Sequence, residues 1–136
     1  MPFWRCYYPV AWTTKSREPL ITLNLEPILF GAIEAKAKSL GCSLLGVNAV
    51  SDHIHAAVTI PPSLSIADWM KHVKGVSSRE INEGQTDALA RFRWQRGYGV
   101  LTFGQRNLPM ILDYIARQKE HHAKGTTHAY MENAED

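Results

Sequence analysis

The sequence has little cysteine, no long apolar run and no large excess of charge of either sign. Cysteine occurs only at Cys6 and Cys42 among 136 residues, without the CxxC pairs or Cys/His clusters that mark zinc sites. We therefore expect two free, buried thiols rather than a disulfide framework. No apolar stretch reaches the roughly 18 residues that span a bilayer, and the N-terminus has no signal-peptide pattern. These absences predict a cytoplasmic protein with no membrane partner.

The length and composition indicate one globular domain. Apolar residues make up 45% of the chain and charged residues 21%, which is the balance of a folded domain rather than a disordered one. A chain of this size accommodates a single core. We expect one domain over residues 1–125 and a short, acidic and mobile tail over residues 126–136.

The net charge of +2 is unevenly distributed. Residues 1–90 are neutral, with eight Lys/Arg and eight Asp/Glu, whereas residues 91–124 contain seven basic and two acidic side chains. A basic segment of this kind indicates a phosphate-rich partner. The charge pattern is equally consistent with an ordinary solvated helix face.

Hydrophobic periodicity and turn signals predict seven elements in the order β-α-β-β-α-β-α. The expected elements are a strand over residues 3–12, a helix over 25–40 capped by Asn24 and stopped by Gly41, strands over 43–50 and 53–60, a helix from the Ser65/Asp68 capping box, a polar loop over 82–90, a strand or hairpin over 91–103, and a helix from Asn107 to about Ala123. This order predicts an α+β, ferredoxin-like split βαβ fold, an antiparallel sheet with helices packed on it and one extra C-terminal helix. Many unrelated activities use this fold, so it does not indicate a function.

Two histidines lie near the start of the predicted strand over residues 53–60. Successive side chains of a strand point to opposite faces, so His53 and His55 project from one face about 7 Å apart, while Ile54 and Ala56 point to the core. Two neutral imidazoles at this spacing can converge on a metal ion, although a His-x-His pair on a strand is more often incidental. Asp52 either orients His53 or caps the preceding turn.

The last predicted helix adds polar groups to one face. Tyr114 and Gln118 are four residues apart and so lie one turn apart on the same side, with His121 and His122 about one turn further along. Taken alone, Tyr114 is equally well explained as a half-buried aromatic with its hydroxyl at the surface. Gln118 would ordinarily be a solvated helix residue.

Three stretches resemble, in combination, the landmarks of a known family. They are DHIH at residues 52–55, WQRGYG at 94–99 and YIARQKEHH at 114–122. In this order they are similar to the single-tyrosine HUH transposases, the insertion-sequence enzymes of the IS200/IS605 type and their REP-associated relatives. The resemblance extends from about residue 7 to residue 124, which is nearly the whole domain.

The resemblance implies a role for each matching residue. Tyr114 matches the nucleophilic tyrosine, His53 and His55 match the metal-binding pair, and Gln118 matches the glutamine that completes the metal site. The family implies a transposase that cleaves and rejoins single-stranded DNA through a covalent 5′-phosphotyrosine. It also implies a homodimer that recognises hairpins. The divalent metal is Mg²⁺ or Mn²⁺, because Mg²⁺ prefers oxygen ligands and nitrogen ligation makes Mn²⁺ at least as plausible.

Basic and aromatic side chains suit a single-stranded DNA partner. The candidate phosphate contacts are Lys71, Lys74, Arg91, Arg93, Arg96 and Arg106. Trp94 and Tyr98 could stack on a base, with core packing as the alternative for Trp94. Two other functions stay open, namely a domesticated nucleic-acid-binding module of the same fold without catalysis, and a metal-binding regulatory or scaffolding domain. The presence of all four catalytic candidates argues against a module that only binds.

Overall fold

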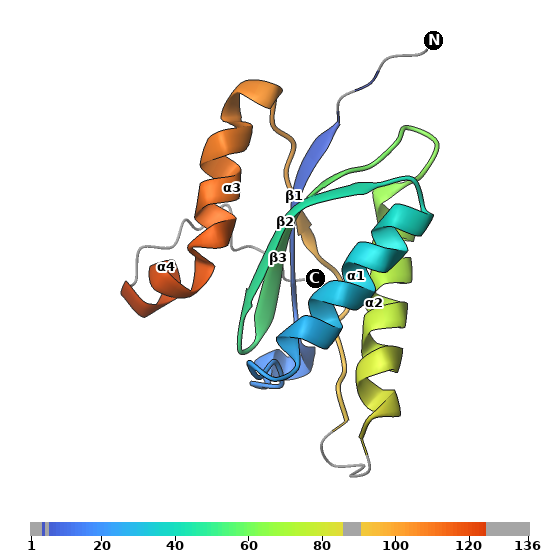
Figure 1. Ribbon diagram of the computed structural model, residues 1–136, viewed down its shortest axis with the longest axis vertical. Coiled ribbons are helices and arrows are strands. Elements are labelled where there is room, and N and C mark those ends of the chain that lie inside the picture. Colours follow the sequence, from blue (N-terminus) through green and yellow to red (C-terminus); the bar gives the residue numbers. More distant parts are fainter. Residues whose placement is uncertain (1–3, 5, 86–90, 125–136) are drawn as a thin grey trace.

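The computed structural model describes residue 4 and residues 6–85 and 91–124. Its elements in chain order are β1 (Tyr7–Thr13), η1 (Lys15–Arg17), α1 (Glu26–Ser39), β2 (Ser43–Val50), β3 (His53–Thr59), α2 (Ile66–Glu83), β4 (Gly99–Val100), η3 (Gln105–Asn107), α3 (Leu108–Ala116) and α4 (Gln118–Lys124). The order agrees with the prediction, except that the last helix is divided in two (Figure 1).

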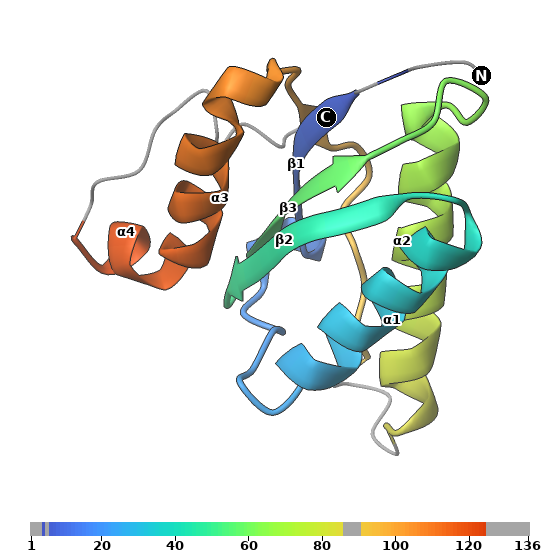
Figure 2. The same ribbon diagram turned by 45° about the horizontal axis from the view of Figure 1, so that its top comes forward.

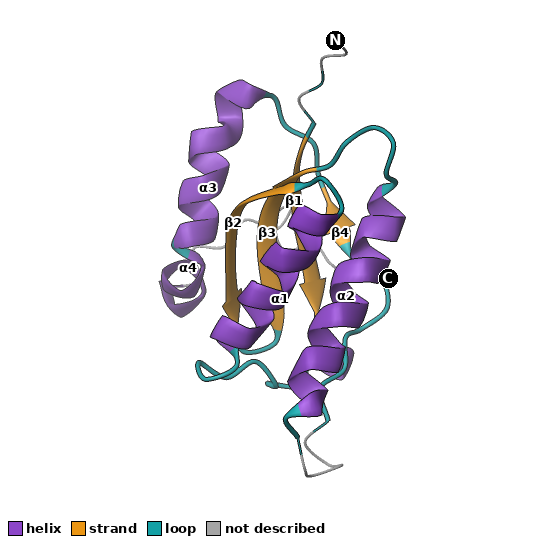
Figure 3. Ribbon diagram, turned by 45° about the vertical axis from the view of Figure 1, so that its right-hand side comes forward, coloured by secondary structure: helices purple, strands orange, loops and turns teal. Residues whose placement is uncertain are grey.

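The four strands form one antiparallel sheet in the order β2-β3-β1-β4. The two connections that carry a helix, β1 to β2 and β3 to β4, place α1 and α2 side by side on the same face of this sheet (Figure 3). This arrangement is the ferredoxin-like split βαβ topology. The predicted α+β fold is therefore confirmed.

The main core lies between the sheet and the pair α1 and α2. Alternate residues of β3 point into it, and the side chains of Ile54, Ala56 and Val58 are 0% exposed, as the period of a strand requires. Trp12 of β1 meets Trp69 of α2 edge to face, with ring centroids 6.2 Å apart. These contacts assign the odd-numbered residues of β3, including both histidines, to the opposite face.

Helices α3 and α4 cover that opposite face (Figures 1 and 2). A second, smaller core joins α3 to the sheet, and its buried members are Ala57, Ile111, Tyr114 and Ile115. Gly46 of β2 permits the close approach of α3, because a Cβ atom there would lie 3.1 Å from the Cδ2 atom of Leu112. The histidine face of the sheet is therefore an interior surface.

Local signals at the helix ends are partly confirmed. The Ser65 side chain accepts a hydrogen bond from the Asp68 N–H at 3.0 Å, as the capping box predicts. Gly41 ends α1 with a φ of 76°. The prediction that Asn24 caps α1 is wrong, because Leu25 holds the cap position in a helical conformation and its N–H already donates to the Thr22 carbonyl at 3.1 Å.

The predicted strand or hairpin over residues 91–103 is mostly irregular. Besides β4, this region forms two isolated bridges, which pair Tyr7 with Phe103 and Thr14 with Trp94. Two of its carbonyl groups, those of Gln95 and Gly97, accept hydrogen bonds from the Lys74 ammonium instead of from a neighbouring strand. Gly97 also has a φ of 81°, which bends the chain away from extended geometry.

Helix α2 continues past the start of the predicted loop. The Asn82 amide nitrogen donates to the Phe92 carbonyl at 2.9 Å, and the Phe92 N–H donates to the Asn82 side-chain oxygen at 2.7 Å. These two bonds fasten the segment after the loop to the end of α2. Residues 86–90 of the loop, residues 3 and 5 of the predicted first strand, and the tail 126–136 lie outside the described residues, and the first strand begins at Tyr7 rather than at residue 3.

The two cysteines are free thiols, as predicted. Cys42 is buried, and burial raises the pKa of its thiol, whereas Cys6 is only partly buried. The expectation of burial is therefore right for Cys42 alone. Among the helices of the described ranges, none is long and apolar enough to cross a membrane.

Candidate active site

The two histidines of β3 project side by side from the face that α3 and α4 cover. His53 is 4% exposed and His55 is 1% exposed, and their ring centroids are 5.4 Å apart. Within the sheet, His53 pairs with Thr13 and Val50, and His55 pairs with Ala11 and Asn48. The prediction that both imidazoles share one face, opposite the core-facing residues, is confirmed.

Asp52 orients the first of these rings. Its Oδ1 atom lies 2.7 Å from His53 Nδ1, and a carboxylate only accepts hydrogen bonds, so Nδ1 carries the proton and donates. The Nε2 atom of a neutral His53 ring then keeps its lone pair.

The turn after β1 lies beside this pair. Ser16 and Arg17 have left-handed backbone, with φ of 55° and 52°, a strained conformation for these residues. Arg17 Nη1 lies 3.9 Å from the second oxygen of Asp52.

The last helix breaks at Arg117, so the predicted continuous helix to about Ala123 is wrong. Asn48 Nδ2 donates to the Ala116 carbonyl at 3.1 Å, the group that would accept from the Glu120 N–H in an unbroken helix. Arg117 has φ −101° and ψ 22°. Arg117 donates hydrogen bonds to Glu120. These bonds, together with the negative charges of Glu120 and Asp113, raise the pKa of the Arg117 guanidinium above its ordinary value.

The break folds the chain back beside the tyrosine. The rings of Tyr114 and His121 are stacked, with centroids 4.5 Å apart and an interplanar angle of 18°. In a straight helix, residues seven apart are separated by about 10.5 Å along the axis. Tyr114 is 6% exposed, and its ring centroid lies 6.2 Å from that of His55. The phenol is therefore a buried group next to the histidine pair, not an aromatic at the surface.

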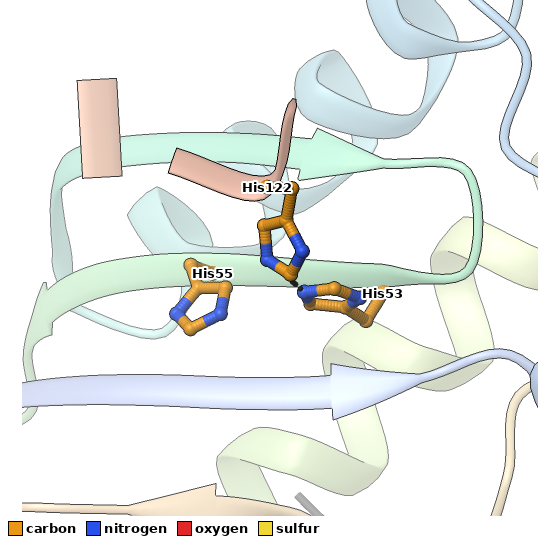
Figure 4. A group of neighbouring side chains, drawn as sticks. All are labelled: His53, His55 and His122. Atoms are coloured by element: carbon orange, nitrogen blue, oxygen red, sulfur yellow. Dashed lines mark hydrogen bonds between the residues drawn. The ribbon is translucent and has the colours of Figure 1, made fainter. Parts of the chain in front are cut away.

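The side chains of Gln118 and His122, both on α4, contact His53 of β3. Gln118 is 0% exposed, so it is not the solvated helix residue that a glutamine at this position would ordinarily be. Its Nε2 atom lies 3.1 Å from His53 Nε2 and 2.7 Å from His122 Nε2. His122 points from α4 toward the pair on β3, and its Nε2 atom lies 2.9 Å from His53 Nε2 (Figure 4).

Sequence reasoning assigned no role to His122. The signal was its position four residues after Gln118, which puts both side chains on one helical face.

The side chains of this cluster fit a divalent metal ion. His53, His55 and His122 each offer a ring nitrogen, and these atoms lie within 4.8 Å of one another. The 2.9 Å between the Nε2 atoms of His53 and His122 is close to the roughly 3 Å between neighbouring ligands of an octahedral ion with bonds of about 2.1 Å. Gln118 would bind such an ion through its amide oxygen, since the amide nitrogen that makes the contacts here only donates. Neutral imidazoles and an amide are ordinary ligands of first-row metals.

The predicted phosphate contacts are divided between two surroundings. A groove of about 470 Å³ lies between α2 and the segment that follows it, and its basic lining residues are Lys74, Arg91, Arg93 and Arg96. The three arginines are exposed. The Lys74 ammonium donates to the backbone carbonyl groups of Gln95 and Gly97. Lys71 and Arg106 are exposed elsewhere and do not line the groove.

The aromatic residues of the 94–99 segment belong mainly to the core. Trp94 Nε1 donates to Ser77 Oγ at 3.0 Å, and its ring meets Trp12 at 5.7 Å and Phe92 at 4.7 Å between centroids. Tyr98 also packs against the main core. These contacts favour the core-packing interpretation of Trp94.

The groove and the histidine cluster are near neighbours across the sheet. The Gln95 N–H donates to the Thr13 carbonyl at 2.9 Å, and Thr13 pairs with His53. Two inter-strand spacings, about 10 Å, therefore separate the backbone of the groove segment from that of His53.

Comparison with known proteins gives consistent matches over most of the chain. A family model described as "Transposase IS200 like" matches residues 2–118. The chain is 29% identical over 126 residues to the transposase for insertion sequence element IS200 of Salmonella typhimurium, covering 90% of this chain and 82% of that protein. It is 22% identical over 117 residues to the ISDra2 transposase TnpA of Deinococcus radiodurans, covering 83% and 84%.

Two solved structures share the fold. A candidate transposase of Deinococcus radiodurans R1 superposes with a TM-score of 0.68 at 23% identity, over 87% of this chain and 95% of that one. A REP-associated tyrosine transposase, bound to a REP hairpin, superposes with a TM-score of 0.67 at 14% identity, over 90% of this chain and 74% of that one.

Proposed function

The chain belongs to the family of IS200-like transposases, and from this premise we propose that it cleaves and rejoins single-stranded DNA through a covalent 5′-phosphotyrosine on Tyr114. Enzymatic transfer of DNA strands is the activity of the family. The roles of single residues are the proposal. Tyr114 is the nucleophile, and His53, His55 and Gln118 hold a divalent metal ion, Mg²⁺ or Mn²⁺.

The observation that carries the proposal is the burial of four polar side chains in one cluster. Tyr114, Gln118, His53 and His55 are each at most 6% exposed, and they come from three elements, β3, α3 and α4, of which the last two follow the first by about 60 residues. Burying polar groups costs free energy that must be offset by their mutual contacts or by a bound ion. A module that only bound DNA would have no use for this combination.

The chemical step needs one nucleophile and one leaving group. The Tyr114 oxygen forms a bond to the scissile phosphorus while the bond from phosphorus to the 3′ oxygen breaks, and the phenolic proton ends on the released 3′ hydroxyl. Strand joining is the reverse step with another 3′ hydroxyl, so the ester bond on Tyr114 conserves the energy needed for rejoining without ATP.

The chain's own residues supply position and charge. A bound divalent ion would neutralise the non-bridging oxygens of the scissile phosphate. Asp52 holds the His53 ring with its Nε2 atom turned into the cluster. The stacked ring of His121 and the apolar side chains of Ile111 and Ile115 restrict the position of the phenol.

The groove beside α2 is our candidate for the DNA path. Arg91, Arg93 and Arg96 line it, and its segment lies two strand spacings from His53. Exposed guanidinium groups suit phosphates of a flexible strand. Since the REP-associated relative is described as bound to a REP hairpin, we propose a single-stranded DNA substrate that carries a hairpin.

We also propose that the protein acts as a homodimer. The support is the edge strand β2, eight residues long, at one side of the sheet. An edge strand presents backbone N–H and C=O groups that a second copy can pair with. Light scattering during gel filtration tests this, and a mass of one chain, about 15.3 kDa, at all concentrations would contradict it.

The test of the nucleophile uses Tyr114→Phe, with Tyr8→Phe as the control. Tyr8 packs on the main core, on the other face of the sheet. Each protein is incubated with end-labelled single-stranded DNA from the flanks of its gene, with Mg²⁺ or Mn²⁺, and run on a denaturing gel. We expect a protein-linked band with the wild type and with Tyr8→Phe, and none with Tyr114→Phe or with EDTA.

Two other results would support the two alternatives, a binding module without catalysis and a metal-binding scaffold. A shifted native complex without a covalent band, for all flanking sequences and both metals, would favour the domesticated binding module. An absence of single-stranded DNA binding at every salt concentration would favour the metal-binding scaffold.

A further inference from the structure

His122 is the polar side chain of the cluster that the proposed function leaves without a task. It comes from α4 and lies against His53 and Gln118, with Nε2 contacts of 2.9 Å and 2.7 Å. Its ring centroid is 4.5 Å from that of His53. Figure 4 shows it pointing from α4 toward the gap between His53 and His55.

The contact between Asp52 and His53 Nδ1 determines which atom of the His53 ring faces His122. Because Nδ1 donates to Asp52, the Nε2 atom of a neutral His53 ring has a lone pair and accepts. That lone pair faces both His122 Nε2 and the Gln118 amide, at 2.9 Å and 3.1 Å. Two imidazole nitrogens and an amide thus converge on one small volume. Both ring nitrogens are possible ligands of a cation, and the amide would bind it through Oε1 once a half turn exchanges that atom with Nε2.

The fold is arranged to hold His122 there. Lys119, three residues earlier on α4, donates to Asn48 Oδ1 at 2.7 Å and to Glu26 at 3.1 Å. Arg117 forms two hydrogen bonds with Glu120, at 2.9 Å and 3.1 Å. These contacts fix the first turn of α4 against β2 and α1, and so aim the following turn at β3.

We propose that His122 is a third imidazole ligand of the metal ion, and that it makes the site selective for a transition metal such as Mn²⁺ over Mg²⁺. The inference rests on the metal site of the proposed function and deepens it. An imidazole nitrogen binds first-row transition ions, Mn²⁺ included, more strongly than Mg²⁺, which prefers oxygen ligands and gains little from a nitrogen.

Two variants separate ligation from simple packing. His122→Phe keeps a ring of similar shape but offers no lone pair. His122→Gln keeps a polar atom at a similar reach and replaces nitrogen by amide oxygen. The control is His72→Phe, at an exposed histidine of α2 outside the set of converging nitrogens.

The measurement is metal affinity without DNA, from the free Mn²⁺ electron paramagnetic resonance signal and from calorimetry with MnCl₂ and MgCl₂. We expect His122→Phe to weaken Mn²⁺ binding by about tenfold or more, with a smaller effect on Mg²⁺. His122→Gln should reduce the preference for Mn²⁺ over Mg²⁺. His72→Phe should keep the wild-type affinities.

The count of bound nitrogens gives an answer that does not depend on the variants folding. In the wild type loaded with Mn²⁺, electron spin-echo modulation should detect three imidazole nitrogens, and two would overturn the inference. A folded His122→Phe with an unchanged Mn²⁺ affinity would overturn it as well. A wild-type covalent band on Tyr114 in either of these cases would leave the proposed function intact.

Discussion

At the scale of single residues, the carboxylate of Asp52 determines which nitrogen of His53 enters the cluster. The 2.7 Å contact with Nδ1 fixes the tautomer and the ring orientation, which is the usual role of a carboxylate behind a metal-binding histidine. The sequence left open whether Asp52 orients His53 or caps the turn. The geometry of the contact supports the first.

Asp52→Asn should therefore weaken metal binding without preventing folding. The amide keeps the size of the side chain but lacks the charge that holds the Nδ1 proton, so we expect Mn²⁺ affinity to fall by about 10- to 100-fold. Calorimetry measures the change. Glu83→Gln, which removes one exposed carboxylate at the end of α2, is the matched control. An equal loss of affinity in both variants would mean that only the overall charge matters.

At the scale of elements, the division between α3 and α4 builds the site. Asn48 of β2 accepts from Lys119 at 2.7 Å and donates to the Ala116 carbonyl at 3.1 Å. One side chain thus ends α3 and anchors α4. The stack of His121 on Tyr114 and the contact of Gln118 with His53 both depend on the direction that α4 then takes.

Removing this anchor should affect activity more than stability. Asn48→Ala loses three hydrogen bonds at a partly exposed position, which costs about 1–2 kcal/mol of folding free energy. Because α4 is then less well placed, we expect the rate of covalent adduct formation to fall by about tenfold or more. Denaturant unfolding and the denaturing-gel assay measure the two effects.

A control with a similar loss of stability makes this result specific. Ser65→Ala removes the cap of α2, for a cost of about 1 kcal/mol, on the face of the sheet away from the cluster. Its adduct rate should remain near that of the wild type. If both variants lose the same activity, general destabilisation explains the effect and the anchor does not.

At the scale of the whole molecule, the two faces of the sheet have different tasks. The face covered by α1 and α2 contains the main core. The other face contains the histidines, Tyr114 and Gln118 beneath α3 and α4. The basic groove lies at the margin between α2 and the segment before β4, so a bound strand would approach the cluster along the β1 side of the sheet.

The groove predicts a local electrostatic contribution to DNA affinity. Arg91→Gln together with Arg93→Gln should weaken single-stranded DNA binding and reduce the slope of log K against log salt by about 1.4, since each phosphate contact contributes about 0.7. Fluorescence anisotropy over a salt series measures the slope. Lys36→Gln with Lys38→Gln, an equal charge change on α1, should leave the slope nearly unchanged. Equal slopes for the two pairs would contradict the assignment of the groove.

The sequence by itself determined the features that depend on local rules. The period of two along residues 53–59 separates the histidines from the core-facing row. The Ser65 cap and the Gly41 stop set the ends of two helices. The order of these elements then restricts the topology to the ferredoxin-like sheet. The resemblance to the family predicted roles for Tyr114 and Gln118, which stay predictions.

Only the tertiary structure decided where local rules are overridden. Asn48 takes the Ala116 carbonyl across 68 positions of sequence, and Lys74 takes two carbonyls from a segment that would otherwise read as a strand. Backbone groups must be paired, but a partner distant in the chain satisfies them as well as a local one. No local pattern records which partner is nearby, so the helix break and the inclusion of His122 in the cluster follow only from packing.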